Sequence, residues 1–207
     1  MIAKIVEYFD ILFPNPKCEL NYNKDYELLI AVMLSAQTTD RSVNKVTEVL
    51  FKRYSTIKQL ACANQDDIID IIRPIGTFQR KSTNIINISK SLLKDYNGIV
   101  PNNREYLESL NGVGRKTTNV VLSNLFEENC LAVDTHVSRV SKRLGLSNKK
   151  DDVNKIEKKL TKRFKGYSLI RLHHQLVLFG RYYCKAKNPE CDNCHLRLYC
   201  KEINRTI

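Results

Sequence analysis

Apolar residues recur at helical spacing in segment after segment of this 207-residue chain. Two of these stripes consist of Tyr26, Leu29, Ile30, Met33 and Leu34, and of Ile85, Ile88, Leu92 and Leu93. Such spacing places the apolar side chains on one face of an α-helix. The alternation of apolar and polar residues that is typical of half-buried strands is missing from the sequence. We therefore expect an all-α fold built from short helices.

Start and stop signals divide this pattern into helices joined by short connections. Pro74, the segment 97–101 and Gly145 are expected to end helices, because Pro cannot continue a helix and Gly or Asn tolerates the left-handed conformation that follows one. The predicted helices span residues 1–12, 25–36, 40–54, 66–72, 79–96, 104–110, 115–126, 135–144, 151–164 and 168–183. Irregular chain is expected beyond residue 183.

The composition is that of a globular protein. Hydrophobic residues make up 43% and charged residues 27% of the sequence, which excludes disordered and fibrous classes. No uncharged apolar stretch approaches the roughly 18 residues that a membrane span requires. The first ten residues carry acids where a signal peptide would be apolar. We expect a cytoplasmic monomer with no membrane partner.

Positive charge is concentrated in the last third of the chain. Residues 1–130 carry 16 Lys and Arg against 15 Asp and Glu, whereas residues 131–207 carry 18 against 7. This asymmetry favours a polyanionic partner, because each phosphate that is neutralised releases counterions. The alternative is a solvated basic face that adds only solubility. The shift in composition near residue 130 is also the best candidate for a domain boundary.

The segment Leu110–Lys116 predicts a helix-hairpin-helix, since it joins a short amphipathic helix to the apolar helix 117–126. Gly112 and Gly114 allow a tight backbone turn, and the N-terminus of the second helix presents N–H groups with a partial positive charge. A DNA phosphate is a suitable ligand for such a terminus. The alternative is an ordinary turn that requires glycine for its torsions.

Lys116 lies in the first turn of that second helix, where the helix dipole disfavours a positive charge. Its amine is therefore a candidate for function. At an unperturbed pKa of about 10.4, only roughly one Lys in 2,500 is neutral at pH 7, so a nucleophilic Lys needs burial or a cationic neighbour. Arg115 and the helix end are candidate perturbers. The alternative is a Lys that contacts phosphate or solvent.

Asp134 follows the apolar run 130–133 and precedes the next predicted helix, so it has the position of an N-cap. An N-cap aspartate accepts hydrogen bonds from helix N–H groups and is structural in most proteins. A carboxylate held near a Lys could instead act as a general base or stabilise a cationic transition state. The residues alone leave both interpretations open.

Four of the seven cysteines lie close together near the end of the chain. Their spacing is Cys184-x6-Cys191-x2-Cys194-x5-Cys200. In a reducing compartment such a group predicts a metal centre and not disulfides. Zinc, with His195 as a spare ligand, and a four-iron, four-sulfur cluster fit this spacing comparably. Either would hold a loop that carries Lys185, Lys187 and Arg197. The solitary cysteines, which we expect to be buried, are Cys18, Cys62 and Cys130.

In this order, the motifs resemble those of the endonuclease III family within the helix-hairpin-helix DNA glycosylase superfamily. The resemblance spans almost the whole chain, and the cysteine spacing is its most specific part. Its segments are Met33–Asp40, Leu110–Lys116, Val133–His136, His174–Arg181 and the four cysteines.

The resemblance implies a two-domain fold. Residues 18–129 would form a six-helix barrel with the hairpin, residues 1–17 and 130–207 an iron-sulfur cluster domain, and DNA would bind in the cleft between them. By the same resemblance, the four cysteines would hold a 4Fe-4S cluster, which we expect to be structural. Lys116 would be the Schiff-base nucleophile and Asp134 the catalytic carboxylate. The residues expected to contact DNA are Gln37, Thr77, Phe78, Gly112, Val113, Gly114, Arg115, Lys185 and Lys187.

Two positions depart from the family pattern. Asn111 replaces the proline that usually precedes the hairpin glycines, and Asn tolerates such a turn position. Thr77 stands where the family often has a bulky residue that wedges into the DNA stack. Phe78 or Ile75 could substitute for it. Gln37 resembles the residue that fills the hole left by the extruded base.

The expected function is a bifunctional DNA glycosylase and abasic-site lyase of base excision repair, associated with the nucleoid through its substrate. It would remove oxidised pyrimidines from double-stranded DNA after flipping the damaged nucleotide. Neutral Lys116 would attack C1′ with the help of Asp134, and the Schiff base would permit β-elimination 3′ to the lesion. The alternatives are a monofunctional glycosylase for mispaired adenine or thymine, against which Lys116 argues, and a non-catalytic DNA-binding module.

Overall fold

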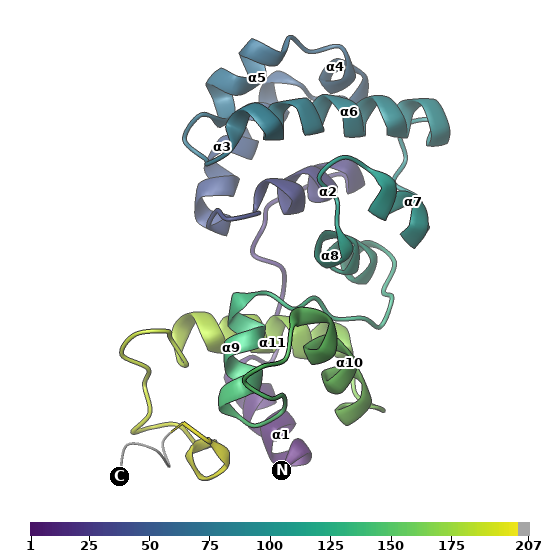
Figure 1. The fold of residues 1–207 in the computed structure, drawn as a ribbon. Helices are drawn as coiled ribbons and strands as arrows, with labels where there is room; N and C mark the ends of the chain where they lie inside the picture. Colours follow the sequence, from purple (N-terminus) through teal and green to yellow (C-terminus); the bar gives the residue numbers. More distant parts are fainter. Residues whose placement is uncertain (203–207) are drawn as a thin grey trace. The chain divides into compact units, whose positions relative to one another are not determined.

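The computed structural model describes residues 1–202. Its helices, in chain order, are α1 (Ile2–Leu12), α2 (Asp25–Leu34), α3 (Asp40–Arg53), α4 (Ile57–Ala61), α5 (Gln65–Ile72), α6 (Phe78–Tyr96), α7 (Arg104–Ser109), α8 (Arg115–Leu125), α9 (Thr135–Arg143), α10 (Val153–Arg163), α11 (Leu169–Tyr182) and the 3-10 helix η1 (Arg197–Tyr199). These 202 residues contain no strand, so the all-α prediction is confirmed (Figure 1). None of these helices is both long and apolar enough to cross a membrane.

The chain divides into two compact units. One is Cys18–Phe126, and the other combines Met1–Lys17 with the chain from Glu127 onward. Residues 127–129, assigned to the barrel by the sequence analysis, therefore group with the second unit. Asn129 gives the physical reason, because its side-chain oxygen accepts the N–H of Leu169 at 2.7 Å and its amide nitrogen donates to the Tyr167 carbonyl at 3.5 Å.

Helix α2 is the centre of the Cys18–Phe126 unit. Its residues from Tyr26 to Leu34 are all buried, as expected of a helix that packs on every side. Helices α3, α6 and α8 pack against it, and Figure 1 shows α2 between α6 and α8. Helix α6, the longest, also covers α4 and α5 with the buried face that carries Ile85, Ile88 and Leu92. The hairpin helix α8 therefore stands directly on the core.

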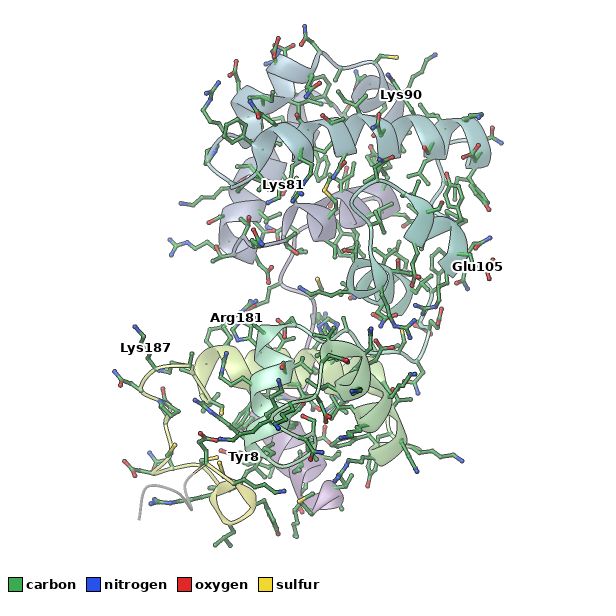
Figure 2. All side chains as sticks on the ribbon, viewed as in Figure 1. Tyr8, Lys81, Lys90, Glu105, Arg181 and Lys187 are labelled. Carbon is green, nitrogen blue, oxygen red and sulfur yellow. The ribbon has the colours of Figure 1, made fainter. Side chains whose placement is uncertain are left out.

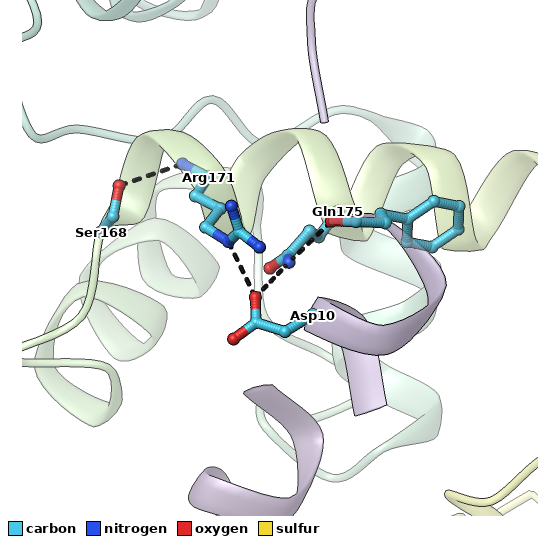
Figure 3. A network of polar contacts seen from close by, with 5 residues as sticks. Asp10, Ser168, Arg171 and Gln175 are labelled. Carbon is cyan, nitrogen blue, oxygen red and sulfur yellow. Dashed lines mark hydrogen bonds and ion pairs between the residues drawn. The ribbon is translucent and has the colours of Figure 1, made fainter. Parts of the chain in front are cut away.

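Helix α11 is the centre of the other unit. Helices α1 and α9 pack against it, and α10 packs against α9. A polar network adds to this packing: Asp10 on α1 accepts hydrogen bonds from Arg171 Nε at 2.7 Å and Gln175 Nε2 at 2.8 Å on α11 (Figure 3). The N-terminal helix is thus attached to a helix that follows it by about 160 residues.

The sequence pattern does not predict helix α4. Five residues are too few to display a helical stripe. Its signal is local, since Thr56 and Gln59 form a capping box with hydrogen bonds of 3.0 and 3.2 Å. Cys62, the C-cap of α4, is exposed, so the prediction that it is buried is wrong. Cys18 and Cys130 are half-buried.

Candidate functional site

The hairpin joins α7 to α8 through the turn at residues 110–114. Val113 is buried and donates its N–H to the Leu110 carbonyl at 3.0 Å. Gly112 has a φ of 79°, and a Cβ there would collide with the side-chain amide of Asn84. Glycine is therefore needed at 112. Because the side chain of Val113 is buried and its N–H is bonded within the turn, neither group is available for the expected contact with DNA.

Gly114 leaves the N-terminus of α8 open. It is the N-cap residue, no side-chain hydrogen bond caps the helix there, and a Cβ on it would meet nothing within 4 Å. The first N–H groups of a helix have no partner within the helix and carry its positive partial charge. This end of α8 can therefore accept an anion the size of a phosphate.

Lys116 is the second residue of α8, and its side chain is exposed. Among residues 1–202 its ammonium makes no hydrogen bond or ion pair. The positive groups next to it along the chain are the N-terminus of α8 and the side chain of Arg115. The amine is open to an electrophile.

Asp134 is the N-cap of α9, as the sequence predicts. Its Oδ1 accepts the N–H of Val137 at 2.7 Å. Its other oxygen, Oδ2, makes no hydrogen bond with the described residues. The carboxylate is half-buried. The capping bond fixes the side-chain rotamer, so the structural and chemical interpretations of this residue are compatible.

The segment before Asp134 is held by α11. Leu131, Ala132 and Val133 are buried, and the Ala132 carbonyl lies 3.0 Å from Nδ1 of His173. A carbonyl can only accept, so Nδ1 of this buried His carries a proton. Sequence analysis does not identify His173 as a functional residue. Its only signal is the unusual pair of histidines on an apolar helix.

Helix α9 approaches α11 closely at Gly180. A Cβ at this position would lie 2.8 Å from Cβ of His136 and 3.2 Å from Cγ2 of Val140. His136 also lies beside Arg139, whose Nη2 is 3.1 Å from its Nδ1 and donates to the Gly180 carbonyl at 2.6 Å. The close approach at Gly180 and the hydrogen bond from Arg139 therefore hold the first two turns of α9 against α11.

The four C-terminal cysteines line one cavity. It encloses about 160 Å³ and is also lined by Arg143, Phe179 and Tyr183. Burial raises the pKa of the Cys194 thiol, and charge on the other three cysteines raises it further. Among residues 1–202 no three His, Cys, Asp or Glu side chains form a group that could hold a metal ion.

Two arginines of α9 bind the start of this cysteine loop. Arg143 donates through Nη1 to Sγ of Cys184 at 3.3 Å and to the Lys185 carbonyl at 2.7 Å. Arg139 donates through Nε to the Cys184 carbonyl at 3.0 Å. A guanidinium beside a sulfur compensates negative charge on a thiolate. Sequence analysis does not identify either arginine, because their partners lie more than 40 residues away.

The polar side chains of the loop differ in their surroundings. Lys185 forms an ion pair of 2.8 Å with Glu190, whereas Lys187 is exposed at the outer edge of the loop (Figure 2). The ring of His195 stacks on Tyr8 with 4.8 Å between centroids, so this residue packs against α1. Arg197 lies 3.6 Å from the exposed Asp192.

The remaining expected DNA contacts lie at two turns of the other unit. Gln37 follows α2 and is exposed, and Thr77, also exposed, precedes α6. Phe78 is half-buried, with the Arg73 guanidinium 5.7 Å from its ring centre. Ile75 is 1% exposed and belongs to the core, so the suggestion that it acts as the wedge is wrong. Thr77 and Phe78 remain candidates.

Comparison with known proteins identifies the family. The model of the HhH-GPD superfamily of base excision DNA repair proteins matches residues 30–166. An endonuclease III of Rickettsia felis is 45% identical over 207 residues, which is all of this chain and 97% of the relative. That of Bacillus subtilis is 44% identical over 191 residues, 92% of this chain and 87% of the relative. The chain belongs to the endonuclease III family.

Solved structures agree with this endonuclease III assignment. A trapped endonuclease III–DNA covalent intermediate superimposes with a TM-score of 0.94 at 43% identity, covering 99% of this chain and 96% of the other. A non-covalent endonuclease III–DNA complex gives the same TM-score and coverage at 44% identity. A thermostable thymine-DNA glycosylase, with a TM-score of 0.86 at 20% identity, shares the fold. The predicted endonuclease III fold is confirmed.

Proposed function

We propose that this chain excises oxidised pyrimidines from double-stranded DNA and cuts the strand at the abasic site through an imine on Lys116. As a member of the endonuclease III family it is a DNA glycosylase with abasic-site lyase activity in base excision repair. The exposed amine of Lys116, beside the open N-terminus of α8, carries the mechanism. The similar endonuclease III trapped in a covalent complex with DNA supports this chemistry.

Lys116 acts as nucleophile in its neutral form, because a protonated amine has no lone pair with which to attack carbon. Nζ attacks C1′ of the deoxyribose, and the bond from C1′ to the base breaks with its electron pair leaving on the base. After proton loss from nitrogen and opening of the sugar ring, Nζ and C1′ share a protonated imine. Loss of a C2′ proton then expels the 3′ phosphate, and water hydrolyses the imine to restore the lysine.

Asp134 assists through its second oxygen. Because Oδ1 is engaged with Val137, Oδ2 is the atom that can stabilise positive charge developing on the sugar or accept a proton from the attacking amine. A carboxylate with a fixed rotamer needs no reorganisation when that charge appears. We therefore assign Asp134 to the transition state and not to substrate binding.

DNA binding combines phosphate contacts with entry into the stack. The N–H groups at Gly114 and the side chains of Arg115 and Lys187 are suited to phosphates. Gln37 fills the space of the flipped nucleotide, and Thr77 or Phe78 enters the neighbouring step. We also propose that the protein is a monomer and works at the nucleoid in the cytoplasm, where its substrate lies.

The four cysteines are suited to a 4Fe-4S cluster. They supply four thiolates, they line one cavity, and Arg143 places N–H groups beside Cys184. When bound, the cluster crosslinks the loop 184–200, a structural role. We expect purified protein to contain iron and absorb visible light, with the absorbance lost in Cys191→Ser. A colourless protein that contains zinc would overturn this assignment.

Borohydride trapping tests the function. Wild-type protein incubated with duplex DNA that contains an abasic site should form a covalent adduct after reduction of the imine, and Lys116→Gln should form none. Lys90→Gln is the matched control, because it removes an exposed lysine of α6 to which no role is assigned, and it should form the adduct as wild type does. Base release without an adduct would indicate a monofunctional glycosylase. DNA binding without base release or an adduct would indicate a non-catalytic module.

A further inference from the structure

Two turns of the Cys18–Phe126 unit share an uncommon backbone conformation. Gln37 and Thr77 both have a φ of 57°, although neither is glycine. Left-handed conformations are rare for residues with a Cβ and persist where surrounding contacts hold them. Under the proposed function these are the residues that enter the DNA, so the contacts that hold the two turns affect how they enter it.

Lys81 contacts both turns. Its Nζ donates to the Ala36 carbonyl at 3.0 Å and to Oγ1 of Thr38 at 2.9 Å, which are the residues on either side of Gln37. Its backbone N–H donates to the Thr77 carbonyl at 3.0 Å. One residue in the first turn of α6 therefore bonds directly to both left-handed turns.

Lys81 is buried although burial of an ammonium group is unfavourable, so the contacts of this group must compensate for the cost. It is 3% exposed, whereas Lys90 on the same helix is exposed (Figure 2). Burial lowers the pKa of Lys81, and the charge of Arg80 lowers it further, so the site disfavours the cation. An apolar side chain would fill this space without that cost. Compared with an apolar residue, a lysine at position 81 adds the hydrogen bonds to Ala36 and Thr38.

The local bonds of the Gln37 turn are few. Oγ1 of Thr38 donates to the Ala36 carbonyl at 3.3 Å, and the N–H of Thr38 donates to the Ser35 carbonyl at 3.1 Å. These bonds close the turn but connect it to nothing outside residues 35–38. The ammonium of Lys81 connects the turn to α6 and, through the first bond of that helix, to Thr77.

We propose that Lys81 is a positioning residue that couples the Gln37 and Thr77 turns, so that they enter a duplex as one preformed unit. This inference rests on the proposed function, because it takes these two turns as the parts of the chain that occupy the DNA stack. Lys81 itself touches no substrate. Removal of the Lys81 side chain should therefore slow the reaction only on a duplex, where the protein has to enter the base stack and fill the space left by the flipped nucleotide.

The test compares two substrates in single-turnover experiments. One is a duplex with an oxidised pyrimidine, and the other is a single strand with a preformed abasic site, which has no opposite base and no hole to fill. Lys81→Met should slow base excision from the duplex roughly tenfold or more, the factor expected when hydrogen bonds from a charged group are lost. Its rate of borohydride-trapped adduct on the single strand should stay within about twofold of wild type. Lys90→Met should match wild type on both substrates.

A second variant and a coupling measurement separate positioning from folding. Thr38→Val, which removes one acceptor without altering the buried site, should show the same substrate pattern to a smaller degree. Combining Lys81→Met with Gln37→Ala should slow duplex excision no further than Gln37→Ala alone, because both changes remove the same contribution. Thermal unfolding monitors the stability of each variant.

Three outcomes overturn the proposal. Equal losses on both substrates would mean a general structural role, wild-type rates in a folded Lys81→Met protein would mean no role, and additive losses with Gln37→Ala would mean that the turns act independently. Failure of the proposed function has a different signature, because wild-type protein itself would then form no adduct on the single strand.

Discussion

Asp134 has one carboxylate oxygen that caps a helix and one to which the proposed mechanism assigns a chemical role. Oδ1 caps α9 through Val137, which an asparagine oxygen can do almost as well. Only a carboxylate can place negative charge on Oδ2. Substitution by Asn therefore separates the cap from the charge, which substitution by Ala would not.

We predict that Asp134→Asn lowers single-turnover base excision on the order of 100-fold or more, while the free energy of unfolding changes by less than about 0.5 kcal/mol. Duplex affinity should be nearly unchanged, because the charge acts in the transition state. Asp152→Asn is the matched control, since Asp152 caps α10 through Lys155 at 2.8 Å and lies outside the site. Equal losses of stability and turnover would reduce Asp134 to a cap.

His174 predicts an acid-sensitive contribution to stability. Burial, and then the charge of His173, lowers its pKa from 6.5 to about 4, and the two rings lie 5.0 Å apart. Between these values the unfolded chain binds a proton that the folded chain does not, so stability falls as the pH drops from 6.5 to 4, by roughly 3 kcal/mol in total. Denaturant unfolding of wild type and His174→Gln measures this. Parallel pH profiles for the two proteins would contradict it.

At the scale of elements, the crossing of α9 and α11 positions Asp134, the carboxylate of the proposed mechanism. Gly180 permits this crossing, because any Cβ would meet His136 and Val140. We predict that Gly180→Ala costs about 1–3 kcal/mol of stability through overpacking, despite the better helix propensity of Ala. Excision should also slow as α9 shifts. Gly76→Ala, whose Cβ would meet nothing within 4 Å, serves as control for the measurement of stability. An unchanged or raised melting temperature for Gly180→Ala would contradict the prediction.

The attachment of α1 to α11 rests partly on Asp10. Burial opposes its ionisation, but the hydrogen bonds from Arg171 and Gln175 outweigh burial and lower the pKa of this carboxyl. The stability it contributes is present above the usual pKa of an aspartate and is lost as the pH falls through the lowered value. We predict that Asp10→Asn costs roughly 1 kcal/mol at neutral pH, a modest figure because the pair is partly exposed. Glu7→Gln, which breaks an exposed ion pair of the same helix, should cost less, and chemical denaturation distinguishes the two.

Sequence patterns predict the long helices and single out the residues proposed for the chemistry, but they do not predict the contacts that support those residues. Helical stripes predict the long helices, while α4 is too short for one and depends on Thr56 and Gln59. Lys116 stands out in the sequence because it places a positive charge at the N-terminus of a helix, where the dipole disfavours it. Asp134 stands out because it occupies an N-cap position. Lys81 and His173 do not stand out, because both act on backbone carbonyls more than 40 residues away. A carbonyl has no sequence signature, so such pairs become visible only in the folded chain.

At the scale of the whole molecule, we expect the basic excess of residues 131–207 to strengthen the binding of any duplex. Phosphate contacts release counterions, so the logarithm of the binding constant should fall linearly with the logarithm of the salt concentration. The steepness of that line counts the cations in contact with DNA. It therefore reports which lysines of the cysteine loop take part.

The two loop lysines should differ in this measurement. Lys187 is exposed at the outer edge of the loop, whereas Lys185 is paired with Glu190 at 2.8 Å. We predict that Lys187→Gln lowers the slope by about 1 on any duplex, damaged or not. Lys185→Gln should lower it less, because releasing Lys185 from Glu190 offsets part of the phosphate contact. Fluorescence anisotropy of a labelled duplex from about 50 to 200 mM salt measures both slopes. Equal slopes for the two variants would show that the ion pair with Glu190 does not persist on DNA, and a wild-type slope for Lys187→Gln would remove this lysine from the interface.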